Sequence, residues 1–435
     1  MANILIAAED SALAQELLQK IRRHGYDGRA VTSLDAALAT VQQEHPDIVL
    51  ATETLIGGTA VGLAMTLRKT AGCAEIPICL AAATRSVEIK QQALSAGIDD
   101  VLFPPLDEIK LVARLRPLVR LAIMRSELHQ RAQTARRFGV DVLEEIPVNT
   151  TPTGYPLLVV GPEGASLSNM LSGARLSFAS DPFVADDLLS RNNFDAAILV
   201  PDANPEPYLD LCAQARNNPR LFNLPVLIVS DLGRIGEEVA YHHGASGFFA
   251  NPVNPLELQT SVLSQVRRQQ ARWSVRRALA ETLQASTRDA ETGVYARSFL
   301  DAYLMDRVKF SGAHGRNLSI MFFCVPDIEG VRLHFGEAQA RHLRLQVSQW
   351  ITGLLRGEDV TARYAENEFC VVLPDTPKSE AEVVMHRIAG VLAYTDFAVK
   401  DVYQPVKIWA RVGSADLLPD DSVSTLTTRA RANIV

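Results

Sequence analysis

Short apolar runs alternate with amphipathic stretches through the first part of the chain. The apolar runs are residues 4–8, 47–51, 76–83 and 101–103. After the first run, Leu13, Leu17 and Ile21 recur at helical spacing, similar stretches follow later runs, and a long helix is expected from Asp107. Strands that alternate with helices in units this short predict a parallel, doubly wound sheet.

A second copy of this pattern follows the first. Its apolar runs are residues 157–160, 196–200, 225–229 and 247–249. The copies match in order and spacing, down to Ser95-Ala96-Gly97 in one and His242-His243-Gly244 in the other. We interpret this match as an internal duplication on the scale of a domain.

The segment 256–288 predicts a long helix. Its apolar positions Val262, Val266, Trp273, Ala280 and Leu283 fall near heptad spacing, with arginines between them. Such a helix is either a stalk that pairs with another chain or a surface helix that packs on its own domain, and the pattern fits both.

The last segment mixes strands and helices in another order, which predicts a separate α+β domain. The strands are expected at residues 318–325, 370–373 and 407–412, and the helices at 338–355 and 379–392. The expected domains are residues 1–146 with a long C-terminal helix, residues 155–270, a helical stalk at 271–288, and residues 289–435.

Composition and charge narrow the function. A chain of 435 residues that is 47% hydrophobic has room for about three domains. Its formal charge of -7 argues against binding of nucleic acid, which needs a basic surface. The five cysteines are scattered, so we expect buried thiols in a reducing cytosol and no metal cluster. No apolar stretch is long enough to span a bilayer, so we expect a cytoplasmic protein without direct membrane insertion.

Three motifs carry a resemblance to a known family. They are Asp289-Ala-Glu-Thr-Gly293, Phe335-Gly336, and the segment 363–375 that contains Ala365-Glu-Asn-Glu-Phe369. With the duplication, they make the whole chain similar to the PleD type of response regulator. This resemblance implies two CheY-like, doubly wound α/β receiver domains followed by an α+β GGDEF domain of the nucleotidyl-cyclase kind. Within this group, the nearest resemblance is to PopA-like cyclic di-GMP effectors.

The residues at the receiver phosphorylation positions do not suit phosphoryl transfer. A receiver needs carboxylates for Mg²⁺, an aspartate nucleophile, a Thr or Ser, and a Lys. By resemblance, these positions hold Ala8 with Glu9, Thr52, Ala82 and Pro104 in the first copy, and Gly161 with Pro162, Val200, Ser230 and Asn251 in the second. Strand periodicity predicts that Glu53 points to the opposite face. We therefore expect neither copy to accept phosphate.

The cyclase site is also degenerate by this resemblance. Cys324 and Asn367 stand where the family holds its metal, and neither replaces a carboxylate on Mg²⁺. The signature otherwise reads Ala365, Glu366 and Glu368, so a negative charge replaces a glycine where the triphosphate would lie. The guanine-reading positions hold Arg332 and Arg341, which only donate hydrogen bonds. We interpret both arginines as solvated helix charges.

One site of the family survives in the sequence. Arg356-Gly-Glu-Asp359 matches the inhibitory RxxD motif that binds cyclic di-GMP, and the second contributing arginine falls on Arg387. A guanidinium bridges a phosphate and the guanine acceptor edge, while a carboxylate accepts from the guanine donor edge. The alternative, in which the motif binds no ligand, is an exposed ion pair between Arg356 and Asp359.

These inferences favour a non-catalytic scaffold that binds cyclic di-GMP, with no metal or cofactor. The resemblance implies a homodimer, a place at the cell pole, and partner proteins of a complex that presents cell-cycle regulators to a protease. Two alternatives stay open: a weak diguanylate cyclase or GTP-binding protein, and a ligand-independent dimerisation scaffold.

Overall fold

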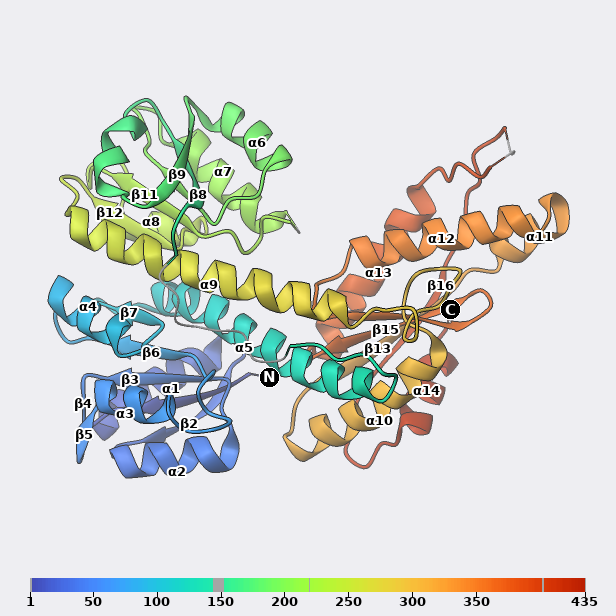
Figure 1. Ribbon diagram of the computed structural model, residues 1–435, viewed down its shortest axis with the longest axis horizontal. Helices are drawn as coiled ribbons and strands as arrows, with labels where there is room; N and C mark the ends of the chain where they lie inside the picture. The colour runs from blue at the N-terminus through green and yellow to red at the C-terminus, as the bar shows by residue number, and fades with distance from the viewer. Residues whose placement is uncertain (1, 144–151, 219, 401–402, 435) are drawn as a thin grey trace. The chain divides into compact units, whose positions relative to one another are not determined.

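The computed structural model describes residues 2–143, 152–218, 220–400 and 403–434 (Figure 1). These residues form two compact units. The N-terminal unit contains residues 2–122 and 152–274, and the C-terminal unit contains residues 123–143 and 275–434. The expected domain boundary at 146 and the chain ends at 1 and 435 lie outside the described residues.

The first copy is a five-stranded parallel sheet in the order β2-β1-β3-β6-β7. Its strands are β1 (Asn3–Ala7), β2 (Asp27–Val31), β3 (Ile48–Thr52), β6 (Ile78–Ala81) and β7 (Asp100–Leu102), with a small hairpin of β4 (Thr54–Leu55) and β5 (Gly58–Thr59). Its helices are α1 (Ser11–Arg23), α2 (Leu34–Glu44), α3 (Ala60–Leu67), α4 (Val87–Ser95) and α5 (Glu108–Arg136). Side chains cap the starts of α1 to α4 by accepting a backbone N–H, namely Asp10, Ser33, Thr59 and Ser86.

The second copy repeats this topology. Its parallel sheet has the order β9-β8-β10-β11-β12, which is the same strand order as in the first copy. Its strands are β8 (Tyr155–Val160), β9 (Ala174–Ala179), β10 (Ala196–Leu199), β11 (Val226–Ser230) and β12 (Gly247–Ala250). Its helices are the 3-10 helix η1 (Gly164–Met170), α6 (Pro182–Arg191), α7 (Glu206–Asn217), α8 (Glu237–His242) and α9 (Pro255–Glu281). Two doubly wound α/β domains are therefore confirmed.

An arginine tie occurs at the same place in both copies. Arg68 donates to the carbonyls of Ala74, Ile76 and Gly97, and Arg216 donates to those of Phe222, Leu224 and Gly244. Both glycines have positive φ, 89° and 94°, which suits the turn that each tie closes. The duplication thus extends to individual hydrogen bonds.

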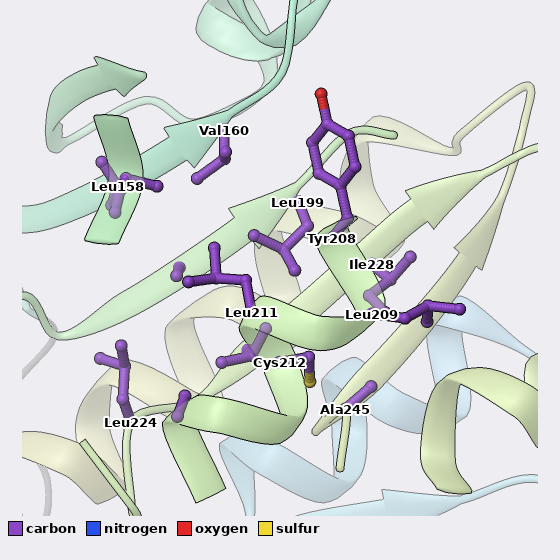
Figure 2. Close-up of a cluster of buried hydrophobic side chains, with 14 of the residues drawn as sticks. Leu158, Val160, Leu199, Tyr208, Leu209, Leu211, Cys212, Leu224, Ile228 and Ala245 are labelled. Carbon is purple, nitrogen blue, oxygen red and sulfur yellow. The ribbon is translucent and has the colours of Figure 1, made fainter. Parts of the chain in front are cut away.

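Apolar side chains from strands and helices make up each core. In the second copy, Leu158, Leu199 and Ile228 from the sheet lie in one cluster with Leu209 and Cys212 from α7 (Figure 2). Burial raises the pKa of the Cys212 thiol to about 11. This cysteine is a core residue, as the sequence predicted.

One edge strand of each parallel sheet, β2 in the first and β9 in the second, was not expected from the apolar runs, whereas the opposite edge strands β7 and β12 were. β2 and β9 each pair on one side only, and their side chains are mostly half-buried or exposed. An edge strand that faces water on one side needs few apolar residues, so it leaves no continuous apolar run.

A buried polar cluster joins the two copies within the N-terminal unit. Arg114 on α5 donates to Asp100 at 2.9 Å, and Arg268 on α9 approaches the same carboxylate within 3.3 Å. Lys90 on α4 donates to Ser261 Oγ on α9. Lys90 is only 4% exposed, and burial, followed by repulsion from Arg114, lowers its pKa to about 8.

The C-terminal domain is an antiparallel sheet in the order β14-β15-β13-β16. Its strands are β13 (Leu318–Cys324), β14 (Val360–Ala365), β15 (Glu368–Pro374) and β16 (Arg411–Asp416). Its helices are α10 (Arg297–Ala313), α11 (Asp327–Phe335), α12 (Glu337–Gly353), α13 (Lys378–Tyr394) and α14 (Val423–Ala432). Met321 and Phe323 of β13 lie in one cluster with Val347 of α12 and Ile388 of α13, so the predicted α+β domain is confirmed.

The last strand does not lie where the sequence predicted it. It was expected at 407–412, but β16 begins at Arg411 and pairs with β13 through Asp416. The residues before it are held elsewhere, because Lys407 pairs with Asp396 at 2.7 Å and the Trp409 N–H donates to Asp327 at 2.7 Å.

The first half of helix α9 shows one of the two roles considered for segment 256–288. Leu258, Val262 and Val266 lie in the core of the second copy, so the first half of α9 packs on its own domain. Trp273 is half-buried and Ala280 is exposed in the second half. Pairing of that second half with another chain stays a prediction.

None of the described helices has the length and apolar character that crossing a membrane requires.

Candidate functional site

A surface pocket of about 380 Å³ opens between the end of α12, the start of β14 and the first turns of α13. Its polar lining residues are Arg356, Asp359, Thr376, Ser379, Glu380 and Arg387, and its apolar ones are Leu354, Leu355, Leu373, Val383 and Val384. The three residues that the sequence assigned to cyclic di-GMP therefore line one cavity in the described structure.

Arg356 and Asp359 belong to a single tight turn. The Arg356 N–H donates to Asp359 Oδ2 at 2.8 Å, and the Asp359 N–H donates to the Arg356 carbonyl at 3.2 Å. Arg356 is exposed and Asp359 is half-buried. The carboxylate thus helps to shape the turn that carries the arginine.

Arg387 reaches the same pocket from α13. Its Nη2 donates to the Leu354 carbonyl at 3.0 Å, just after the end of α12. This bond satisfies a carbonyl that the helix end leaves unpaired and fixes the guanidinium on the pocket wall.

The lining suits a flat anionic ligand. Two guanidinium groups offer paired N–H donors to phosphate or guanine acceptors, and the Asp359 carboxylate offers acceptors to guanine N–H groups. Val383 and Val384 supply an apolar surface for a base. Because Glu380 adds a second carboxylate, the pocket is not strongly positive, and binding would depend on hydrogen-bond geometry more than on net charge.

Four of the positions expected for cyclase chemistry lie at the β14–β15 hairpin, at the opposite end of β14 from this pocket. Ala365 ends β14, Glu366 and Asn367 form the turn, and Glu368 begins β15. Cys324 at the end of β13 lies opposite Glu368 in the sheet. Burial, followed by the Glu368 charge, raises the pKa of the Cys324 thiol, which favours the neutral thiol over a metal-binding thiolate.

Glu368 is engaged by a residue that the sequence reasoning did not single out. It is 6% exposed and accepts from Arg431 Nε at 2.8 Å and Nη2 at 3.2 Å. Arg431 also lies over the Tyr364 ring, with its guanidinium carbon 5.2 Å from the ring centroid. The Glu368 carboxylate therefore already has a cationic partner within the chain.

The arginines at the guanine-reading positions behave as helix charges. Arg332 on α11 donates to Glu329 one turn earlier, and this hydrogen bond raises the pKa of Arg332. Arg341 on α12 is exposed and lies 3.9 Å from Glu291.

Arg344 is a further residue of this region that sequence reasoning missed. It is 1% exposed, contacts Glu291, and lies 3.5 Å from Glu337 and 3.8 Å from Glu366. Glu291 also accepts from Arg363 at 2.6 Å. The signal in the sequence was an arginine on the mostly apolar helix face that carries Leu343 and Val347.

Apart from Glu9, which is exposed, the receiver positions of the first copy are occupied by uncharged residues. Ala8 and Ala82 are buried, Pro104 is exposed, and the Thr52 hydroxyl donates to the Thr54 carbonyl at 3.0 Å. None of these four residues carries a titratable group.

The expectation for Glu53 was wrong. β3 ends at Thr52, so strand periodicity does not extend to Glu53. Its Oε1 accepts from the Ala83 N–H at 2.7 Å, which brings the carboxylate across to the segment after β6.

The corresponding positions of the second copy hold other groups. Val200 is buried, Ser230 is buried with its hydroxyl 3.4 Å from the Asp231 carbonyl, and the Asn251 amide donates to Asp231 Oδ1 at 3.0 Å. Asp231, which the sequence reasoning did not consider, is thus a carboxylate near the strand ends.

Family models match two parts of this chain. The family described as "Diguanylate cyclase, GGDEF domain" matches residues 286–434, and that described as "Response regulator receiver domain" matches residues 4–116. The response regulator PleD of Caulobacter vibrioides is 24% identical over 436 residues, which cover 99% of this chain and 95% of PleD. The DNA-binding response regulator MtrA of Mycobacterium tuberculosis is 30% identical over 166 residues, or 36% of this chain and 68% of MtrA.

Among solved structures, the GGDEF domain of DgcB from Caulobacter crescentus in complex with c-di-GMP matches 34% of this chain and 85% of its own, with 18% identity and a TM-score of 0.33. A response regulator from Chloroflexus aurantiacus matches 27% of this chain and 98% of its own, with 25% identity and a TM-score of 0.27.

Proposed function

Because this chain is a PleD-like response regulator with receiver and GGDEF domains, we propose that it is a cyclic di-GMP receptor without cyclase activity. The observation that carries the proposal is the pocket at Arg356, Asp359 and Arg387, where two guanidinium groups and a carboxylate surround one cavity. This donor and acceptor set is complementary to a guanine base and its phosphate.

Residues at and near the β14–β15 hairpin support the proposal that the chain does not synthesise cyclic di-GMP. Joining two GTP molecules needs Mg²⁺ held by carboxylates, but Cys324 and Asn367 supply a thiol and an amide. Glu368 is tied to Arg431, and Glu366 adds negative charge beside the expected triphosphate position. Repulsion at this turn opposes binding of the triphosphate.

The proposal extends to the role of PopA-like effectors. Ligand binding would stabilise one arrangement of a homodimeric scaffold at the cell pole, and the degenerate receivers would dock partner proteins for regulated proteolysis. Loss of phosphoryl chemistry at Thr52 and Val200 favours a docking role for the receivers over a phosphorylation switch.

Calorimetric titration of the full chain with cyclic di-GMP, GTP and GMP tests the proposal. Cyclic di-GMP should bind, and Arg356→Ala should weaken it by about 1.5 to 3 kcal/mol, the usual contribution of hydrogen bonds to a charged group. Arg332→Ala is the matched control, because it removes an arginine from the former guanine site and should leave the affinity unchanged. A wild-type protein that does not bind cyclic di-GMP would leave the ligand-independent scaffold as the better account.

A synthesis assay addresses the cyclase alternative. No cyclic di-GMP should form from GTP and Mg²⁺, even in the Arg356→Ala variant. A triple variant with Cys324→Asp, Ala365→Gly and Glu366→Gly should also be inactive, because Asn367, Arg332 and Arg341 remain. Product from the unmodified chain would establish the weak-cyclase alternative instead.

A further inference from the structure

A buried ionic network lies beneath the proposed ligand turn in the C-terminal unit. At its centre is Glu127 on the second half of α5, which is fully buried. Its carboxylate accepts from the Tyr303 hydroxyl at 2.8 and 2.9 Å and from Arg131 Nε at 3.0 Å. Arg307 Nη1 lies 3.6 Å from the same carboxylate.

The network ends on the ligand turn itself. Arg131 is 3% exposed, and its Nη2 donates at 2.6 Å to the carbonyl of Glu358, which stands between Arg356 and Asp359 in the turn. The turn is also covered by α9, because the Arg276 Cγ lies 3.5 Å from the place a Cβ on Gly357 would take. Arg131 of α5 thus contacts the backbone that carries the ligand-binding residues, and Arg276 of α9 lies close to it.

We propose that Arg131 is a positioning residue for the cyclic di-GMP turn, which couples ligand binding at Arg356 and Asp359 to the packing of α5 on the C-terminal domain. This inference rests on the proposed function and adds its regulation. Arg131 does not line the pocket, so it acts only through the Glu358 carbonyl.

The helix that carries Arg131 belongs to both compact units. α5 is one helix from Glu108 to Arg136, and its first half contributes Leu111 and Leu115 to the buried interior of the N-terminal unit. A partner that displaces α5 would therefore disturb the hydrogen bond to Glu358. By linkage, a ligand that tightens the turn must stabilise the docked α5 by the same free energy.

The variant Arg131→Ala tests the coupling, and the contacts of Glu127 indicate that it will fold. Its carboxylate keeps the Tyr303 hydroxyl and the Arg307 guanidinium, so removal of Arg131 does not leave a buried charge alone. The matched control is Arg137→Ala, which removes an ion pair of 2.8 Å between the end of the same helical segment and Asp306 on α10.

Cyclic di-GMP affinity should fall about 5- to 100-fold in full-length Arg131→Ala, the range of typical coupling energies. It should stay within about twofold of wild type in Arg137→Ala, even if both variants lose some thermal stability. Equal affinity in wild type and folded Arg131→Ala would overturn the coupling, whereas a wild type that binds no cyclic di-GMP would defeat the proposed function itself.

Hydrogen exchange gives a second test that needs no variant. In the wild type, saturating cyclic di-GMP should slow amide exchange in residues 123–136, and this protection should be lost in ligand-saturated Arg131→Ala. If ligand binding did not change exchange in that segment of the wild type, the inference would be contradicted. A residue with a purely structural role would not carry the effect of ligand binding to α5.

Discussion

Asp359 has two roles at the scale of one residue. One carboxylate oxygen accepts the Arg356 N–H and shapes the turn, and the carboxylate also lines the pocket. Loss of the side chain would therefore change both the turn and the ligand contacts. Two substitutions separate these effects, because an amide keeps an acceptor oxygen but replaces the other oxygen with a donor.

Asp359→Asn should keep the turn and lose guanine recognition, whereas Asp359→Ala should lose both. We expect weaker cyclic di-GMP binding in each, with an additional loss of about 0.5 to 1.5 kcal/mol in unfolding free energy for Asp359→Ala only. Calorimetry and chemical denaturation measure the two quantities. Glu380→Gln is the control from the same pocket and should bind at least as well as wild type, because it removes a carboxylate from the lining. If Asp359→Asn bound as tightly as wild type, Asp359 would have no part in recognition.

At the scale of elements, local hydrogen bonds occupy polar groups at the ends of the parallel strands. In the first copy, Glu53 accepts a hydrogen bond from the Ala83 N–H, and the Thr52 hydroxyl donates one to the Thr54 carbonyl. In the second copy, Asn251 is bound to Asp231. These local hydrogen bonds satisfy groups that a phosphoryl ligand would otherwise need.

The full chain should therefore form no adduct with beryllofluoride or acetyl phosphate in the presence of Mg²⁺. Mass spectrometry of the intact protein and of its peptides is the measurement, with a catalytically competent receiver as positive control. A stable phosphoryl group mapped to residues 1–270 would contradict the assignment of both receivers as degenerate.

Because Lys90 is buried in the cluster between α4 and α9, we expect the stability of the folded chain to depend on pH. The folded-state pKa of Lys90, about 8, lies below its ordinary value of 10.5, so the folded chain releases this proton first as pH rises. Stability should increase with pH from about 8 to 10.5, because the unfolded chain binds more protons in that window. Lys90→Met should raise the unfolding free energy at pH 7 by about 1 to 3 kcal/mol and flatten this pH dependence.

Denaturation at several pH values measures the effect of Lys90→Met. Lys69→Met, at an exposed position in the same copy, is the control and should change stability by no more than about 0.5 kcal/mol. A loss of stability in Lys90→Met at pH 7 would mean that its bond to Ser261 outweighs the cost of burying its charge.

At the scale of the whole molecule, the described residues form two compact units, and the proposed ligand pocket belongs to the C-terminal one. A ligand that binds only the folded state stabilises the unit that holds it, by about 2.7 kcal/mol at a hundred times the dissociation constant. Cyclic di-GMP should raise the temperature of the calorimetric transition that includes the C-terminal unit. The Arg356→Ala protein should show no such rise at the same ligand concentration, and an equal rise would place the ligand elsewhere.

The parts of the fold that the sequence predicted are those with a strong local signal. Buried strands such as β1 and β8 are continuous apolar runs, whereas the edge strands β2 and β9 are not, and they were missed. The position of β16 was also wrong, because contacts of Lys407 and Trp409 with distant residues decide where that strand begins.

The candidate pocket was predictable because two of its charged residues share one short motif. Arg344 and Arg131 were not, since their roles depend on partners far away in the chain, Glu291 for the first and the Glu358 carbonyl for the second. A buried arginine in an amphipathic helix is a weak signal in the sequence, and its partners are known only when the chain is folded.

The buried contacts of Tyr303 and Arg307 with Glu127 affect which fragment is suitable for study of the C-terminal domain. The GGDEF family match begins at residue 286, so a fragment chosen from it lacks Glu127 and Arg131. Arg307 would lose one of its two carboxylate neighbours and the Glu358 carbonyl would lose its donor. Excision at the family boundary would thus remove part of this domain's own interior, and the pocket studied in such a fragment would differ from the pocket that the intact chain builds.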